Sequence, residues 1–176
     1  MSFEVQVLVL GAESTGKTLL LKRLQNVLQD GYKEEEEFEI IPPTVPTIGT
    51  NLANITFNKR KLNFRELGGA MAPIWKNFYG ESNAVMYLID VSNNFQIAAS
   101  TILFFDVLKA EKLSKIPILL LFNKTDLASN LSIQEHKFIL RLTDLEKHVT
   151  QKLTVVECSL KTGNGIKDLK DWLLTI

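Results

Sequence analysis

The amino-acid sequence predicts a three-layer α/β domain in which helices cover both faces of a mainly parallel, six-stranded sheet with one antiparallel edge strand. Three observations support this fold class. Short apolar segments alternate with segments of helical spacing, two predicted strands are joined by only three residues, and 176 residues suit one domain with a full core. Because strands that alternate with helices pair in parallel, we expect residues 1–176 to form a single domain.

The first predicted elements follow from hydrophobic spacing. Residues 5–10 are short, apolar and β-branched and stop at a glycine, as buried strands do. Residues 17–29 carry four leucines at helical spacing, with Arg23 among the polar residues on the other side. Residues 30–49 have no period and contain three prolines, so they are predicted to form a long surface loop. Loops of this length in a compact domain are usually functional.

The rest of the chain continues the same alternation. Residues 51–57 and 61–66 look like two strands joined at residues 58–60 and predict an antiparallel hairpin. Ser92 or Asn93 is the predicted N-cap of a helix that runs to about residue 113. The other predicted elements are strands at 84–90, 118–122 and 154–158 and helices at 73–79, 133–140 and 166–174.

Charge and composition exclude several classes of protein. Lysine plus arginine and aspartate plus glutamate number 20 each, which argues against a nucleic-acid-binding protein with its excess of basic residues. The one cysteine, Cys158, excludes an intrachain disulfide and favours a reducing setting. The apolar runs are too short to span a bilayer, residue 2 is not the glycine that myristoylation needs, and the C-terminus carries no prenylation cysteine. We expect a cytoplasmic monomer without an intrinsic membrane anchor.

Residues 11–18, G-A-E-S-T-G-K-T, match the phosphate-loop pattern G-x-x-x-x-G-K-[ST] between a predicted strand and a predicted helix. Such a loop curls tightly so that its N–H groups and the helix N-terminus face a phosphate chain. Lys17 is expected to reach the β- and γ-phosphates, and the Thr18 hydroxyl is expected to bind Mg²⁺. The predicted phosphate contacts are Glu13, Ser14, Thr15, Gly16, Lys17 and Thr18.

The segment N-K-T-D at 123–126 follows an apolar strand at the edge of the sheet where ligands of α/β proteins bind. Asp126 can accept two hydrogen bonds from guanine, whereas adenine would leave the carboxylate unpaired, which is costly when buried. Asn123 can tie the base loop to the phosphate loop, and the Lys124 stem can lie along the purine face. The sequence therefore predicts GTP or GDP as the ligand.

Residues 157–162, E-C-S-L-K-T, resemble the E-x-S-A-K element of Ras-type GTPases, with Leu160 where alanine is usual. In that family the backbone N–H groups of this loop bind the guanine carbonyl oxygen, which here implies contacts from Ser159, Leu160 and Lys161. A plain turn before the last helix explains the same residues equally well.

Three further segments resemble the Arf and Arf-like GTPases over essentially the whole chain: P-T-I-G-T-N at 46–51, E-L-G-G at 66–69 and P-I-W-K-N-F-Y at 73–79. The resemblance implies a P-loop NTPase G domain that switches between GTP and GDP with Mg²⁺ and works with effector, exchange and activating proteins. It implies that Thr47 supplies a second Mg²⁺ hydroxyl and Gly69 a backbone N–H for the γ-phosphate. Glu66 replaces the family aspartate, which reaches the ion through water, and is expected to act through water as well or, being longer, to coordinate the ion directly.

The hydrolytic residues depart from the family pattern. Ala70 stands where the family has the glutamine that orients the attacking water, so we predict slow GTP hydrolysis. Glu13 is either a catalytic base or a solvated acid. One alternative is a pseudo-GTPase that holds GTP without turnover. A second alternative is a nucleotide kinase, which the N-K-x-D motif disfavours.

The expected partner surface also departs from the family pattern. Thr50 and Arg65 replace two aromatic positions of the Arf effector surface and only Phe78 stays aromatic, which predicts different partners. Trp75 is expected in the core. The acidic run 34–37 is either a solvated loop or a docking patch for a basic partner.

Overall fold

The computed structural model describes residues 4–29, 41–127 and 129–176, so the acidic run 34–37 lies outside the described residues. The elements follow in this order: β1 (Glu4–Gly11), α1 (Lys17–Gln29), β2 (Thr50–Phe57), β3 (Arg60–Leu67), the 3₁₀ segment η1 (Gly69–Glu81), β4 (Ala84–Asp90), α2 (Ile97–Lys109), the 3₁₀ turn η2 (Glu111–Leu113), β5 (Ile118–Asn123), α3 (Ile133–Ile139), α4 (Leu142–His148), β6 (Leu153–Glu157) and α5 (Ile166–Thr175).

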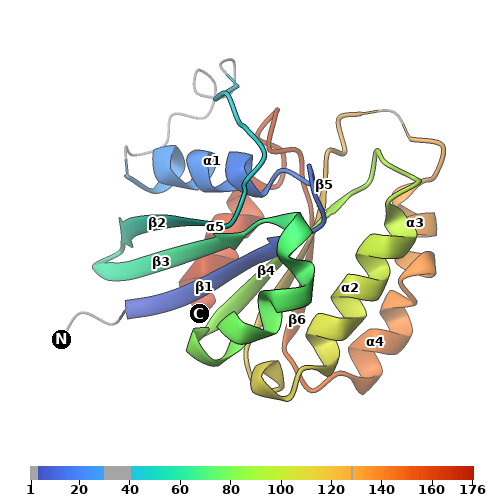
Figure 1. Ribbon diagram of the computed structural model, residues 1–176. Coiled ribbons are helices and arrows are strands. Elements are labelled where there is room, and N and C mark those ends of the chain that lie inside the picture. The colour runs from blue at the N-terminus through green and yellow to red at the C-terminus, as the bar shows by residue number, and fades with distance from the viewer. Residues whose placement is uncertain (1–3, 30–40, 128) are drawn as a thin grey trace.

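The described strands form one sheet in the order β2-β3-β1-β4-β5-β6. Strand β2 runs antiparallel to β3, and the other neighbouring strands pair in parallel. Helices α1 and α5 lie on one side of the sheet, and η1, α2 and α4 lie on the other (Figure 1). The predicted fold class, with six strands and one antiparallel edge, is confirmed.

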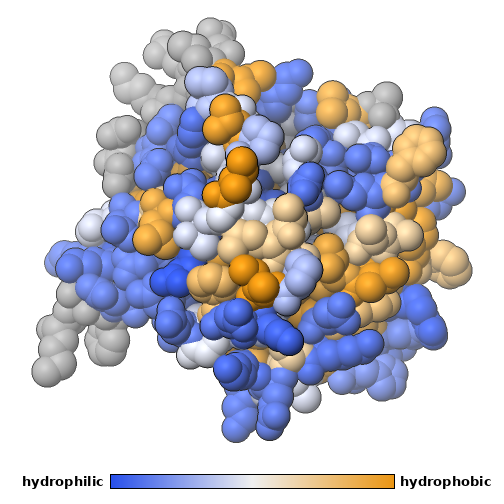
Figure 2. Space-filling model, in the orientation of Figure 1, coloured by the Kyte–Doolittle hydropathy of each residue, from blue (hydrophilic) through white to orange (hydrophobic). Residues whose placement is uncertain are grey.

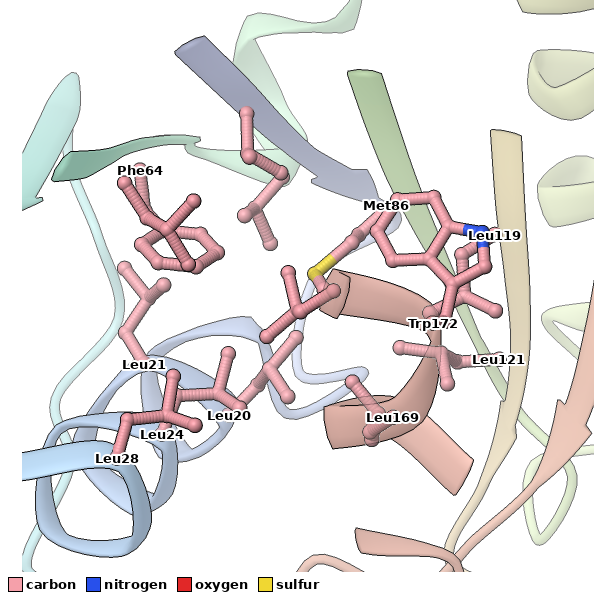
Figure 3. Packing of buried hydrophobic residues seen from close by; sticks show 14 of the residues in the cluster. Leu20, Leu21, Leu24, Leu28, Phe64, Met86, Leu119, Leu121, Leu169 and Trp172 are labelled. Atoms are coloured by element: carbon pink, nitrogen blue, oxygen red, sulfur yellow. The ribbon is translucent and has the colours of Figure 1, made fainter. Parts of the chain in front are cut away.

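Buried apolar side chains fill the space on both sides of the sheet. On the side of α1 and α5, the cluster includes Leu24, Phe64, Met86 and Trp172 (Figure 3). Alternate residues of the central strands face the other side, where Tyr87 packs against η1 and α2. Because both faces are covered, the central strands are continuously apolar rather than alternating.

Trp75 lies in the second of these clusters, as predicted. It is 2% exposed, and its Nε1 donates to the Gly68 carbonyl at 3.1 Å. The tryptophan thus fixes the start of η1 against the end of β3. Figure 2 shows an apolar band on the face that η1 and α2 form, where Ile74 and Ile102 are exposed. Within the described ranges, no helix has the length and apolar character needed to cross a membrane.

The structure differs from the predicted helices in three places. Helix α2 spans Ile97–Lys109 with Gln96 at its N-cap, instead of starting after Ser92 or Asn93 and running to about residue 113, and the Ser92 hydroxyl donates to Asp90 Oδ1 at 2.6 Å. The predicted helix at 73–79 is part of a longer 3₁₀ segment that contains Pro73. Helix α4 was not predicted, and Arg141, with a left-handed φ of 50°, separates it from α3.

Candidate nucleotide-binding site

The phosphate loop joins β1 to α1 at the carboxyl edge of the sheet. Gly16 has a φ of 100°, and a Cβ there would lie 2.5 Å from Asn123 Nδ2. Gly11 has a φ of 146°, and its Cβ would lie 2.5 Å from the Leu88 carbonyl oxygen. Both positions need glycine because the curled backbone approaches neighbouring strands closely.

Lys17 lies across this loop. Its Nζ donates to the carbonyl oxygens of Gly11 at 2.9 Å and Ala12 at 2.7 Å. Burial lowers the pKa of Lys17 to about 8, although the carboxylates of Glu66 and Glu13 act to raise it. The ammonium is therefore held at the centre of the loop with its desolvation only partly compensated.

Four polar side chains from separate segments meet beside the loop. The hydroxyls of Thr18 and Thr47 donate to Glu66 Oε1 at 2.6 and 3.0 Å, and the two hydroxyl oxygens are 3.1 Å apart. Asn51 Nδ2 donates to Glu66 Oε2 at 3.0 Å. Glu66 is 1% exposed. The structure thus brings together Thr18, Thr47 and Glu66, the three residues that the sequence assigned to the metal side.

The segment before β2 also touches the start of η1 and the phosphate loop. The Gly68 N–H donates to the Gly49 carbonyl at 2.9 Å. A Cβ on Gly68 would lie 2.4 Å from the Thr47 carbonyl oxygen, and one on Gly69 would lie 2.4 Å from the Glu13 nitrogen. Neither glycine tolerates a side chain here, because three backbone segments pack directly on one another.

Asn123 links the predicted base loop to two other loops. Its Nδ2 donates to the Thr15 carbonyl at 2.8 Å, and its Oδ1 accepts from the Leu160 N–H at 3.2 Å. Asp126 Oδ1 accepts from the Ser159 hydroxyl at 2.6 Å. The structure therefore brings together the three predicted base-binding segments: residues 123–126, the phosphate loop and the loop after β6.

Lys124 has a left-handed backbone with a φ of 69°, and its Nζ lies 2.6 Å from Asp90 Oδ2. Asp90 ends β4 and is 5% exposed. Its other carboxylate oxygen accepts from the backbone N–H of Ser92 at 2.9 Å and from the Ser92 hydroxyl. This carboxylate fixes the direction of the Lys124 side chain.

Sequence reasoning missed three residues near the site: Asp90, Arg23 and Gln96. Arg23 was placed on the polar side of α1, but it is 1% exposed, and it donates to the Leu160 carbonyl at 3.0 Å and the Lys161 carbonyl at 3.3 Å. Gln96 Nε2 donates to the Glu13 carbonyl at 3.1 Å. These residues lie outside every motif. Arg23 and Asp90 are marked only by an unusual buried polar position, and Gln96 is half-buried and has no such mark.

Neither Cys158 nor the histidines add a further reactive centre to this edge. Burial raises the pKa of the Cys158 thiol to about 12, which keeps it protonated and unreactive. His136 is buried, and its Nδ1 lies 2.8 Å from the Ser132 carbonyl oxygen. Among the residues that the structure describes, no three His, Cys, Asp or Glu side chains gather into a metal-binding group.

The full chain, residues 1–176, matches the model of the ADP-ribosylation factor family. Human ADP-ribosylation factor-like protein 16 is 42% identical over 167 residues, which cover 94% of this chain and 83% of that protein. ADP-ribosylation factor-like protein 3 of Chlamydomonas reinhardtii is 30% identical over 173 residues, covering 97% and 89%. A solved structure of the Arl6 BBS3 small GTPase from Trypanosoma brucei, with a bound nucleotide analogue GppNp, has a TM-score of 0.80 at 20% identity and covers 98% of this chain and 96% of that one. This last likeness concerns the fold alone.

Proposed function

This chain belongs to the ADP-ribosylation factor family of GTP-binding small GTPases, and we propose that it is a switch that binds GTP and GDP with Mg²⁺ and hydrolyses GTP slowly when alone. The observation that carries the proposal is the position of Asn123. Its side-chain amide bonds to the phosphate loop and to the loop after β6 at once. One residue thereby sets the distance between a phosphate site and a base site.

The phosphate contacts would come from the curled loop and the segments packed on it. The backbone at 13–18 and the N-terminus of α1 supply N–H groups for a phosphate chain. Lys17 already lies at the centre of the loop, and Gly69 packs on the Glu13 backbone, so its N–H is the donor proposed for a γ-phosphate. Mg²⁺, held near Thr18, Thr47 and Glu66, would neutralise phosphate charge.

The base contacts would come from the loops after β5 and β6. Asp126 is oriented by the Ser159 hydroxyl, so its carboxylate is set to accept from guanine. Lys124 is held by Asp90, which leaves its stem to cover one purine face. The backbone N–H groups of Ser159, Leu160 and Lys161 are the donors proposed for the guanine carbonyl oxygen.

Slow hydrolysis follows from the residues beside the γ-phosphate position. Ala70 is exposed and has no group that could hold a water. Glu13 is the acidic side chain of the phosphate loop, and Gln96 contributes an amide that already donates to the Glu13 carbonyl. We propose that an activating protein supplies the missing group, and that effector and exchange proteins also act on this chain.

The proposed partner surface around Thr50, Arg65 and Phe78 should bind partners that differ from those of an Arf protein with an aromatic surface. The Arg65 guanidinium lies 5.4 Å from the centre of the Phe78 ring and 3.4 Å from the Glu81 carboxylate. The Phe78 ring is thus covered by a charge. These positions would select partners by charge and hydrogen bonding more than three aromatic residues do, beside apolar neighbours such as the exposed Leu52.

One experiment tests the whole proposal. The purified protein is examined for its bound nucleotide by chromatography, and a single turnover of GTP with Mg²⁺ is then followed. We expect guanine nucleotide and slow GDP formation, which Lys17→Ala abolishes. Bound GTP that is never converted would instead support a pseudo-GTPase, which Ala70 by itself does not distinguish from a slow switch. Bound ATP would contradict the guanine site.

A further inference from the structure

The last strand of the sheet, β6, has a free outer edge. Among the described strands it pairs only with β5. The Ile118 N–H donates to the Lys152 carbonyl at 3.0 Å at the start of β6, and the Cys158 N–H bonds back to β5 at 2.8 Å just after its end. Successive residues of a strand direct their main-chain groups alternately to its two sides, so even-numbered residues face β5. The N–H and C=O groups of Leu153 and Val155 therefore point outward, where a further strand could pair.

A groove of about 570 Å³ lies between β6 and α5. Thr154 and Val156 line it from the strand, and Asp168, Asp171 and Trp172 line it from the helix. The Trp172 ring belongs to the apolar cluster on this side of the sheet (Figure 3), so it gives the groove an apolar part beside the two carboxylates. A strand added beside β6 would direct every second side chain to the side of the sheet on which α5 lies.

The charges around this groove favour a basic partner. Asp168 and Asp171 are exposed, and within the described ranges neither carboxylate forms an ion pair. Glu157 also lines the groove, but its carboxylate is paired with Lys137 at 2.6 Å. Of the described residues, Lys152 is the one basic residue in the lining. Two acidic charges therefore remain against one basic charge.

We propose that the free edge of β6 binds an extended basic segment of a partner protein, which pairs as an additional strand and directs lysine or arginine side chains toward Asp168 and Asp171. Main-chain hydrogen bonds would supply affinity, and the alternate side chains would supply specificity. In an antiparallel pair of two β6 strands, the acidic α5 helices of two copies would lie on the same side of the sheet, so charge disfavours a second copy as the occupant.

This inference goes beyond the proposed nucleotide function and does not rest on it. No residue that lines the groove is among the proposed nucleotide contacts. The groove also belongs to the half of the sheet that carries the base loops, away from the switch segments. Docking at β6 is therefore separate from the partner surface around Phe78.

Val155→Pro tests the strand edge. The Val155 N–H points away from β5, so proline removes an outward donor and leaves the pairing with β5 in place. The probe is a fluorescent peptide of alternating lysine and valine, and anisotropy measures its binding to the full chain. We expect the unaltered chain to bind it and Val155→Pro to bind it about tenfold more weakly, because a main-chain hydrogen bond is lost.

A double variant, Asp168→Asn with Asp171→Asn, tests the charge. Both side chains are exposed, so their loss should leave the fold intact, and affinity for the peptide should fall by about fivefold. Glu146→Gln removes an exposed acidic charge on α4, outside the groove, and should leave the affinity unchanged.

Two further peptides carry N-methyl groups on the lysines only or on the valines only. Alternate N–H groups of a strand point to opposite sides, so one of the two should lose binding and the other should keep it. Which peptide loses binding shows whether the segment runs parallel or antiparallel to β6.

No binding of the unmethylated peptide, or equal affinities for the two methylated peptides, would overturn the inference even if Val155→Pro failed to fold. Unchanged affinity in a folded Val155→Pro would overturn it as well. Sedimentation measures self-association on the same samples. Self-association that Val155→Pro abolishes, without peptide binding, would assign the edge to a second copy instead.

Discussion

The base-binding loops and the switch segments lie at the same edge of the sheet, but different contacts hold them. On the base side, Asn123 and the buried Arg23 make hydrogen bonds to the main chain of neighbouring loops. On the switch side, the segment before β2 is anchored at the Glu66 carboxylate and by the bond from Gly68 to Gly49. Between these anchors, Ile48 is 99% exposed.

This difference indicates which half a ligand can move. The base side is tied by bonds between protein groups, so it is organised before any nucleotide arrives, and little ordering entropy remains to be lost on binding. The switch side converges on one carboxylate beside the proposed ion. A change in phosphate or metal would therefore alter the switch segments and leave the base loops in place.

Asp126→Asn removes the proposed guanine acceptor on the base side and should have the largest effect. The affinity for GTP should fall by about 10³-fold or more, because an amide NH₂ then faces the donors of guanine, whereas xanthine nucleotide gains a partner. Competition between GTP and XTP measures the change. Asp171→Asn on α5 is the matched control and should keep the preference for GTP. Unchanged preference in Asp126→Asn would remove this residue from the base site.

Arg23→Met tests whether the base side depends on its buried cation. Two main-chain carbonyls lose a charged donor, so the free energy of unfolding should fall by about 2–3 kcal/mol in urea titrations. Bound GDP should also dissociate faster, because Leu160 and Lys161 lose their support. Lys167→Met replaces an exposed base on α5 and should change neither quantity. A stability loss without faster GDP release would make Arg23 a residue for folding only.

The pKa of Lys17 makes the phosphate contact sensitive to pH. With a pKa of about 8, the lysine of the nucleotide-free protein loses its charge above that pH, while a bound phosphate keeps it protonated. Affinity for GDP should therefore be about tenfold lower at pH 9 than at pH 7. Equilibrium binding of a fluorescent GDP checks this, and an affinity that does not change with pH would contradict it.

The same shift affects the stability of the nucleotide-free protein in the opposite sense. The ordinary pKa of lysine is 10.5, so the unfolded chain holds this proton more tightly than the folded chain does. The contribution of Lys17 to the free energy of unfolding should therefore rise between pH 8 and 10.5. Chemical unfolding of the nucleotide-free protein at pH 7 and pH 9.5 provides the comparison.

Ala70→Gln tests the catalytic capacity of the switch side and should have the smallest effect. A glutamine at this exposed position can hold a water near the γ-phosphate, so single-turnover GTP hydrolysis should rise by about fivefold. This is well below what a fully positioned catalytic group contributes. Ala70→Leu is the control for size and should not raise the rate. Equal rates in both variants would show that water orientation is not what limits hydrolysis.

The strands and the edge hairpin were predictable because local spacing decides them. Continuous apolar segments mark strands that are buried on both faces, and the short connection after β2, predicted as three residues and two residues long in the structure, allows only a hairpin. Helix ends were less predictable. Ser92 bonds to Asp90 instead of capping α2, and the left-handed backbone of Arg141 separates α4 from α3. Neither of these two features produces a periodic pattern of apolar residues in the sequence.

For the site, the sequence alone determined which residue types are present and on which loops they lie. The phosphate loop, N-K-T-D and the glycines at 68 and 69 are local patterns, because each places several groups within one turn of backbone. The tertiary structure alone decided that Glu66 meets two threonine hydroxyls, that Asp90 holds Lys124 and that Arg23 is buried. These partners are far apart in the chain, and the distances between them depend on how strands and helices pack.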